Sequence, residues 1–367
     1  MDHGASSKYE TAEPCYNQSS PFFLATLGVA FLCSRITFNP SRALLSYKQT
    51  WSGWLQVLKE CLVGTGGWAY FHVPGISPLA AYSRVFSFVE VNSTFYQMPS
   101  LKEVERWRRL VPRDFQFSVR AHRSITHTLR FRPVNAVFEA FEKMKQICQL
   151  LGANVLHLQT PSSLNLNEAF VLDFRQLLSS INLGKLRLAL EVRGTRGGSL
   201  PHELLKVMQD NNIIHGVDLS KGEMPAYDSD ILYTRLFGKG QHNIYQPTDE
   251  ELVEIDRKAS SSKSEKISMS FHFVRMYKDA ARLKTYKQTG KFPMITRSTG
   301  IPSLEEVLSE DAAFPTTKQN LIHRQGWKLF DVTKTERTRV GEFLQRLPDG
   351  TYNDLAEVTD RLASMTR

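Results

Sequence analysis

Short apolar runs alternate with amphipathic helical patterns through the middle of the chain. Between the runs, apolar residues recur at helical spacing, as Phe138, Phe141, Met144 and Ile147 do. The runs have the length and the β-branched or aromatic content of buried strands, and eight of them occur: residues 62–67, 86–91, 115–120, 153–159, 186–192, 213–218, 231–236 and 267–273. Buried strands alternating with helices predict a parallel α/β sheet, and eight such units are what a TIM-type (β/α)8 barrel requires.

A doubly wound open sheet would give the same alternation of strands and helices. The dinucleotide-binding form of that fold carries a Gly-x-Gly-x-x-Gly motif after its first strand, and none follows residues 62–67. Gly64, Gly66 and Gly67 are explained more simply as room for the backbone at the rim of a barrel. The barrel is therefore the predicted fold, over residues 61–295.

Polar and aromatic residues gather where the predicted strands end. In (β/α)8 barrels the active site lies at the carboxyl ends of the strands. In chain order, those ends carry Trp68, Tyr70, Glu90, Asn92, Tyr96, Arg120, His122, Arg123, His127, Gln159, Glu191, Arg193, Asp218, Arg235 and His272. Their convergence on one face predicts a functional site.

Glu90 lies inside an otherwise apolar strand. An unpaired buried carboxylate is costly, so Glu90 either has a partner or takes part in chemistry. Arg120 on the next predicted strand is the candidate partner. Glu191 and Arg235 are interpreted in the same two ways, as a structural ion pair or as catalytic residues. We hypothesise catalytic roles for all four. The carboxyl groups would be general acid and base if burial separates their pKa values, and the arginines would stabilise developing negative charge.

The other side chains at the strand ends are candidates for ligand binding. The aromatic rings either pack at the rim or stack on a base or sugar, and the histidines are either idle and exposed or anion-binding. This set comprises Trp68, Tyr70, Asn92, Tyr96, His122, Arg123, His127, Arg193 and Asp218.

Arginine is concentrated around the third predicted strand. Residues 106–132 contain eight arginines and one acidic residue, Asp114. Three of the arginines fit the solvated face of a predicted helix: Arg106, Arg108 and Arg109. Four others fall on the strand and its loop at the predicted mouth: Arg120, Arg123, Arg130 and Arg132. The guanidinium fork suits phosphate oxygens, and the net charge of +9 agrees with an anionic partner. We therefore expect a phosphorylated small molecule or nucleic acid as ligand.

No motif identifies a cofactor. A divalent metal would take Glu191, Asp218 and His272 as ligands, with His122 or His127, but no spacing such as His-Glu-x-x-His favours it. Four widely spaced cysteines without a Cys-x-x-Cys pair argue against a cysteine zinc site and a disulfide framework. They indicate reduced thiols in a cytoplasmic protein.

Three blocks of sequence carry a family resemblance. They read Leu-Val-Gly-Thr-Gly-Gly-Trp-Ala-Tyr at 62–70, Val-Glu-Val-Asn-Ser-Thr-Phe-Tyr-Gln-Met-Pro at 89–99 and Phe-Gln-Phe-Ser-Val-Arg-Ala-His-Arg-Ser-Ile-Thr-His at 115–127. With looser similarity continuing to about residue 290, the chain resembles the domain of unknown function 72 family, also called YecE-like. The resemblance implies a TIM-type barrel and a site at its mouth but no reaction, since the family has no established activity.

Three segments depart from the pattern of that family. Its seventh strand usually ends Arg-x-His-Gly, where this chain has Arg235-Leu-Phe237-Gly238. Its eighth usually ends Phe-Asn-Asn or Phe-Asp-Asn, where this chain has Phe271-His272-Phe273. The His-Pro-x-Trp segment after strand five is replaced by Gly-Thr-Arg-Gly-Gly at 194–198. An enzymatically degenerate barrel is therefore one interpretation.

Both ends of the chain lie outside the predicted barrel. Residues 1–60 are expected to be a poorly ordered extension. Their apolar run at 21–33 is too short to span a bilayer; a signal peptide is the alternative, since the run has the length of its apolar core, but only Lys8 supplies a Lys or Arg before it. The segment 304–367 contains Pro-Thr-Thr-Lys-Gln-Asn-Leu at 315–321 and Leu-Pro-Asp-Gly-Thr-Tyr at 347–352. It resembles the domain of unknown function 2795 family, which implies a small helical appendage. We expect it to bind a protein partner, and no membrane.

Besides an enzymatically degenerate barrel, two functions fit these observations. The chain is either a hydrolase or lyase that acts on a phosphate ester or nucleic acid through carboxylate and arginine chemistry, or a non-enzymatic module that binds nucleic acid. Binding to a nucleic acid would weaken steeply with salt, whereas a small-molecule pocket would be less sensitive.

Overall fold

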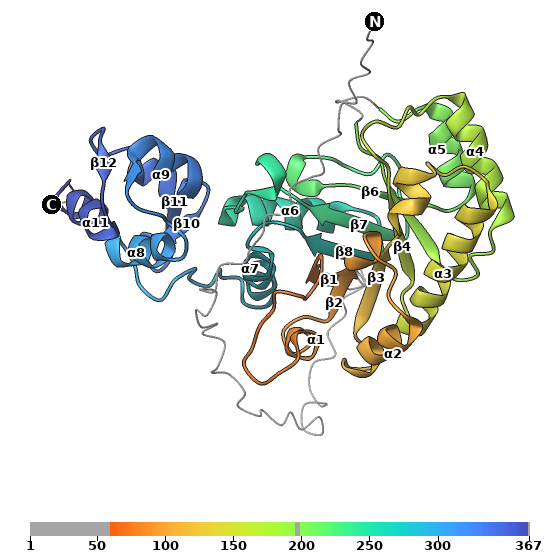
Figure 1. Cartoon of the computed structure of the whole chain (residues 1–367), viewed down its shortest axis with the longest axis horizontal. Helices are drawn as coiled ribbons and strands as arrows, with labels where there is room; N and C mark the ends of the chain where they lie inside the picture. The colour runs from red at the N-terminus through yellow and green to blue at the C-terminus, as the bar shows by residue number, and fades with distance from the viewer. Residues whose placement is uncertain (1–58, 195–198, 366–367) are drawn as a thin grey trace, which may run out of the picture.

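The computed structural model describes residues 59–194 and 199–365. Its central sheet has eight parallel strands in the order β6-β5-β4-β3-β2-β1-β8-β7. A parallel bridge between Val217 and Thr234 joins the two ends of this order, so the sheet closes into a barrel (Figure 1). The strands are β1 (Glu60–Thr65), β2 (Phe88–Val91), β3 (Gln116–Arg120), β4 (Val155–Gln159), β5 (Arg187–Glu191), β6 (Ile214–Gly216), β7 (Ile231–Leu236) and β8 (Lys266–Phe271). All eight predicted strands, and with them the α/β barrel, are confirmed.

Helices cover the outside of the barrel. They are α1 (Pro78–Tyr82), α2 (Leu101–Arg109), α3 (Asn135–Leu151), α4 (Glu168–Ser180), α5 (His202–Asp210), α6 (Asp249–Ser261) and α7 (Met276–Thr289). In α3, Phe141, Met144 and Ile147 are buried in the core that the helix shares with the strands. The apolar spacing in the sequence therefore marks the face of the helix that packs on the barrel.

Alternation along the strands gives the barrel interior an apolar end and a polar end. Inside it, one cluster of buried side chains consists of Leu62, Phe88, Val155, Ala189, Ile214, Ile231 and Tyr233. Side chains of a strand return to the same face at every second residue. The residues two or four positions further along these strands therefore also face inwards, and they include Glu90, His157, Gln159, Glu191 and Arg235. This periodicity builds the polar carboxyl end.

Gly64 allows β1 to lie close to β2. A Cβ atom at this position would lie 2.1 Å from the carbonyl oxygen of Phe88. That oxygen accepts a hydrogen bond of 2.8 Å from the Tyr82 hydroxyl, which in turn accepts one of 3.0 Å from the backbone N–H of Thr65. Because these bonds hold the carbonyl in place, there is no room for a side chain.

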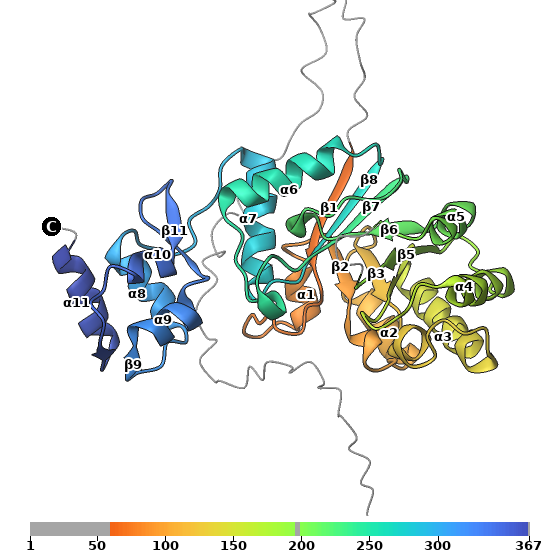
Figure 2. The ribbon, with the colours of Figure 1, turned by 90° about the horizontal axis from the view of Figure 1, so that it is seen from above.

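A second, smaller core follows the barrel in residues 301–365, which we call the C-terminal unit. Its helices are α8 (Ile301–Ser309), α9 (Lys318–Gln325), α10 (Val340–Leu344) and α11 (Leu355–Met365). Two short antiparallel pairs join them: β9 (Thr316–Thr317) with β12 (Thr351–Tyr352), and β10 (Leu329–Asp331) with β11 (Arg337–Arg339). The buried side chains include Leu304, Val307, Leu321, Phe330 and Leu344. The unit lies beside α6 and α7 in both views (Figures 1 and 2).

The predicted extension lies outside the described residues, apart from residues 59 and 60, and β1 already begins at Glu60. Across residues 59–194 and 199–365, no helix combines the length and the apolar character needed to cross a membrane.

We predict that Gly64→Ala lowers the free energy of unfolding by about 1–3 kcal/mol, because the added methyl group must displace the backbone of β2. Urea denaturation followed by circular dichroism measures this. Gly350→Ala is the matched control, since a Cβ there meets no atom within 4 Å. Equal unfolding midpoints for the two variants would contradict the packing argument.

Candidate functional site

A buried ion pair between β2 and β7 lies at the centre of the site. Arg235 and Glu90 are 1% and 0% exposed. The Arg235 Nε lies 2.9 Å from Glu90 Oε2 and its Nη2 lies 3.0 Å from Oε1, while the Tyr233 hydroxyl donates to Oε2 at 2.7 Å. Burial alone would raise the pKa of Glu90, but the charge of Arg235, with His272 nearby, holds that pKa well below its usual range. Glu90 is therefore ionised at neutral pH.

The predicted pairing of Glu90 with Arg120 is wrong. Arg120 lies on β3, next to β2 in the sheet, but its guanidinium bonds to side-chain amides rather than to Glu90. Inward-facing side chains of a closed barrel meet across its axis, and Glu90 therefore reaches Arg235, 145 residues away in sequence.

Glu191 on β5 is the second carboxylate that Arg235 binds. The Arg235 Nη1 lies 2.8 Å from Glu191 Oε2. The other hydrogen bonds to this carboxylate come from Gln159 Nε2 at 2.5 Å, Arg193 Nε at 3.0 Å and His157 Nε2 at 3.1 Å. Burial would raise the pKa of Glu191, but Arg235 and the neighbouring donors hold that pKa well below its usual range. Arg235 thus links two ionised carboxylates.

This network fixes the protonation states at the centre of the site. The pKa values of Glu90 and Glu191 are both lowered rather than separated, so neither carboxyl group is a proton donor near neutral pH. Burial and the charge of Arg235 lower the pKa values of His157 and His272 to about 4, which keeps both imidazoles neutral. The charges at the centre of the site are therefore fixed near neutral pH.

Arg120 differs from the other buried cations of the site. It is 8% exposed, and its guanidinium donates to the neutral side chains of Asn92, at 2.8 Å, and Gln159. Its guanidinium carbon lies 3.7 Å from the centre of the Phe95 ring, and Nε is buried with no hydrogen-bond partner among the described residues. Burial and Arg235 lower its pKa to about 10, so it remains charged at neutral pH.

The mouth above this centre carries two partly exposed cations around Phe237. The Phe237 ring stacks on His272 with centroids 4.5 Å apart, and the charged groups of Arg193 and Lys221 lie 5.2 and 5.7 Å from its centre. Asp218 accepts the backbone N–H of Phe237 at 3.0 Å. Burial raises the pKa of Asp218 to about 6.

The remaining predicted ligand-binding residues lie on loops at the same ends of the strands. Trp68 is half-buried, with its ring edge-on to Trp107 at 5.2 Å, which is packing of the kind expected at a rim. Tyr70 and Tyr96 are exposed, at 65% and 55%. His122 Nδ1 lies 2.8 Å from the Ser124 hydroxyl.

His127 and the arginines of the same loop complete this list. The His127 ring lies edge-on to Phe95 at 4.9 Å, so it contacts the wall of the Arg120 site. The loop arginines are exposed, namely Arg123, Arg130 and Arg132. The predicted solvated face of α2 was wrong for Arg108, whose Nη1 donates to the backbone carbonyl of Phe115 at 2.8 Å.

The predicted metal ligands do not form one site. Glu191 is occupied by donors inside the barrel, Asp218 caps the 3-10 helix Leu219–Lys221, and His272 Nε2 bonds to the Ser270 hydroxyl at 3.0 Å. Within the described parts of the chain, no three His, Cys, Asp or Glu side chains are arranged to hold a metal ion.

Sequence reasoning missed several side chains of the network. His157 and Tyr233 each lie two residues before a predicted site residue on the same strand, so strand periodicity alone was enough to find them. Phe95 ends the 3-10 helix Ser93–Phe95 and was expected only as a rim or stacking aromatic, while Phe237 lies in a loop; no pattern in the sequence marked the contacts of either ring with arginines.

We predict that Glu90→Gln lowers the free energy of unfolding at pH 7 by about 3–5 kcal/mol, because Arg235 loses a buried charged partner. The folded-state pKa of Glu90 lies below the ordinary value of 4.5, so its stabilising effect is complete above pH 4.5 and is lost as pH falls through the folded-state pKa. Urea denaturation between pH 7 and pH 3 should therefore show that the free energies of unfolding of wild type and Glu90→Gln converge as the pH falls. Glu139→Gln, on the exposed face of α3, is the control; a constant gap between wild type and Glu90→Gln would contradict the assignment.

Comparison with known proteins places this barrel among relatives of unknown function. The chain is 27% identical to UPF0759 protein YunF of Bacillus subtilis over 184 residues, which cover 46% of this chain and 64% of YunF. It is 33% identical to UPF0759 protein YecE of Escherichia coli K12 over 85 residues, 23% of this chain and 31% of YecE. The chain thus spans less than two thirds of the length of these curated relatives.

A solved structure and a family model cover the barrel more fully. The crystal structure of a DUF72 family protein from Thermotoga maritima matches 62% of this chain and 99% of that chain, with a TM-score of 0.50 and 20% identity, which supports the fold. The model of the family described as "Protein of unknown function DUF72" matches residues 62–290, more than half of the chain. The chain therefore belongs to the DUF72 family.

Proposed function

We propose that the carboxyl-end face of the barrel binds a phosphate-containing ligand through Arg120. One observation carries this proposal: Arg120 is a buried cation whose hydrogen bonds go to neutral amides and not to a carboxylate. Buried charges are rarely left without an opposite charge in direct contact. A bound anion would supply that contact, and the guanidinium fork suits phosphate oxygens.

The charges around Arg120 support an anionic ligand. With His157 and His272 neutral, the charges of Arg120 and Arg235 balance those of Glu90 and Glu191 at the centre, and Arg193 and Lys221 add positive charge at the mouth. The side chains of Arg193 and Lys221 are 36% and 43% exposed. They are placed to attract an anion from solvent towards the buried arginine.

Aromatic side chains near Arg120 suit the rest of such a ligand. Phe95 already packs on the guanidinium, and the exposed Tyr96 ring lies edge-on to Phe95 at 5.0 Å. A base or sugar attached to the phosphate would stack on Tyr96. Nucleic acid and phosphorylated small molecules share this chemistry.

Hydrolysis of the ligand would need a proton donor other than Glu90 and Glu191, since both are ionised. Asp218 at the mouth titrates nearer neutrality than Glu90 and Glu191, because burial raises its pKa to about 6. In this proposal Arg120 and Arg193 stabilise negative charge, and Asp218 is the candidate acid.

The C-terminal unit is proposed as a domain of its own. Its core is separate from that of the barrel, which supports a boundary between residues 295 and 304. Residues 304–367 resemble the domain of unknown function 2795 family, and we propose that this unit binds a protein partner.

We propose a cytoplasmic location because the described cysteines are not in disulfides. Within the described residues, Cys61 and Cys148 are free thiols, and free thiols are usual in reducing compartments.

We predict that Arg120→Met weakens binding of inorganic phosphate at least about tenfold, the effect of losing one charged hydrogen bond. Isothermal titration calorimetry of the full chain measures the affinity. Arg106→Met, an exposed change on α2, is the matched control and keeps wild-type affinity. Equal affinities for wild type and Arg120→Met, or no phosphate binding by wild type, would refute the proposal.

Salt dependence and one further variant distinguish the two ligand sources. Nucleic acid is indicated if the logarithm of the affinity for a single-stranded oligonucleotide falls linearly with the logarithm of salt concentration, and if the affinity also falls in the exposed variant Arg123→Met. A ribose phosphate that binds with little dependence on salt indicates a small-molecule pocket.

A further inference from the structure

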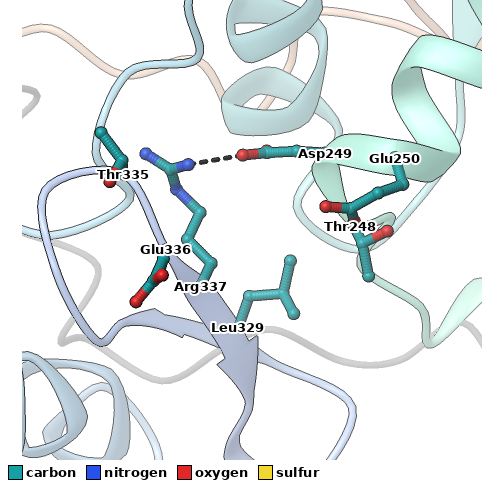
Figure 3. A pocket seen from close by; sticks show the side chains of 7 residues that line it. All are labelled: Thr248, Asp249, Glu250, Leu329, Thr335, Glu336 and Arg337. Atoms are coloured by element: carbon teal, nitrogen blue, oxygen red, sulfur yellow. Dashed lines mark hydrogen bonds and ion pairs between the residues drawn. The ribbon is translucent and has the colours of Figure 1, made fainter.

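Partly buried charges hold the C-terminal unit on the barrel. Arg337 of β11 binds Asp249 at the start of α6, beside a pocket of about 150 Å³ (Figure 3). On α7, Lys278 lies 3.1 Å from Glu310 of the C-terminal unit, and Arg275 binds the same carboxylate. The unit is therefore docked at defined points of the two helices next to β7 and β8.

Gln246 connects this junction to the loop between β7 and α6, residues 237–248. It is 0% exposed. Its side-chain carbonyl accepts the backbone N–H of Leu329 in β10 at 2.8 Å, and its backbone carbonyl accepts Nη1 of Arg339 in β11 at 3.2 Å. The Arg339 guanidinium also lies 5.0 Å from the centre of the Tyr245 ring and pairs with Glu251 at 3.6 Å. The C-terminal unit thus contacts the end of the loop directly.

The beginning of the same loop forms part of the mouth of the barrel. It carries Phe237, which stacks on His272 above the ion network. The two ends of the loop touch, because Gly238 packs against Tyr245: a Cβ on Gly238 would lie 2.5 Å from that ring, and its φ of +81° is one that glycine favours. In the middle, the Asn243 amide donates to the backbone carbonyl of His272 at 2.6 Å.

These contacts form one short path from the C-terminal unit to the mouth. Arg339 and the backbone of Leu329 hold Gln246 and Tyr245. Tyr245 packs on Gly238, next to Phe237. We propose that the C-terminal unit positions the β7–α6 loop, and through it the wall of the mouth made by Phe237 and His272, so that Arg339 is a positioning residue for the site. The effect on ligand affinity rests on the proposed function.

Hydrogen–deuterium exchange of the full chain tests the positioning without any ligand. In Arg339→Met, we expect the backbone amides of Phe237, Gly238 and Val274, which are bonded within or beside the loop, to exchange about tenfold faster. Amides of β2–β4 keep wild-type rates. Arg324→Met is the matched control, since Arg324 is exposed on α9 of the same unit, and it leaves the loop unchanged.

Faster exchange confined to β10 and β11, with loop amides at wild-type rates, would overturn the proposal. If Arg339→Met fails to fold, Arg339→Lys is measured instead; it keeps the charge but loses the fork, and an intermediate acceleration of the loop is expected.

Calorimetry with inorganic phosphate tests the link to binding. We expect severalfold weaker affinity in Arg339→Met than in Arg324→Met, and equal affinities would show that the loop does not contribute to the ligand site. Absence of phosphate binding by wild type would refute the proposed function alone, because the exchange rates still decide whether the C-terminal unit positions the loop.

Discussion

The guanidinium of Arg235 binds two carboxylates inside the barrel, Glu90 on β2 and Glu191 on β5. Each of these groups would lose its hydration on burial, and each is acceptable there only because the others are present. The bidentate geometry towards Glu90 and the single bond towards Glu191 also set how the three strands face one another. The polar half of the interior is therefore one connected structure.

That structure decides which chemistry the site supports. Two carboxylates held ionised, and two histidines held neutral, give a fixed pattern of charge rather than a pair of groups that exchange protons near pH 7. Among the site residues that the structure describes, Arg120 has no opposite charge in direct contact; it lies at the edge of the network and against Phe95. We propose that a site of this kind recognises an anion, and that Asp218 at the mouth, whose pKa burial raises to about 6, is its acid.

The fold was predictable from the sequence because each strand is a short buried apolar run and the helices carry a helical period. The polar strand ends were located where these runs stop, and the structure brings Glu90, Glu191 and Arg235 together inside one barrel. Their partners were not predictable in the same way. Contacts across the axis of a barrel join residues far apart in sequence, and adjacency of strands suggested Arg120 instead.

Shorter features gave too little signal. The strands of the C-terminal unit contain two or three residues each, too few for a period of two to be recognised. Arg108 matched a solvated helix face, and its hydrogen bond to the carbonyl of Phe115 depends on the path of the following loop. The loop contacts of Phe95 and Phe237 likewise depend on tertiary structure.

The buried hydrogen bonds that join Glu90, Arg235 and Glu191 also constrain how such a barrel can change over evolutionary time. Removing any one of the three takes a charged partner from a buried group, so single substitutions at these positions are selected against on stability alone. Exchange for an apolar interior would require the positions to change together. In an alignment of relatives, residues 90, 191 and 235 are therefore expected to covary as a unit, while loop positions such as 237 vary independently of them.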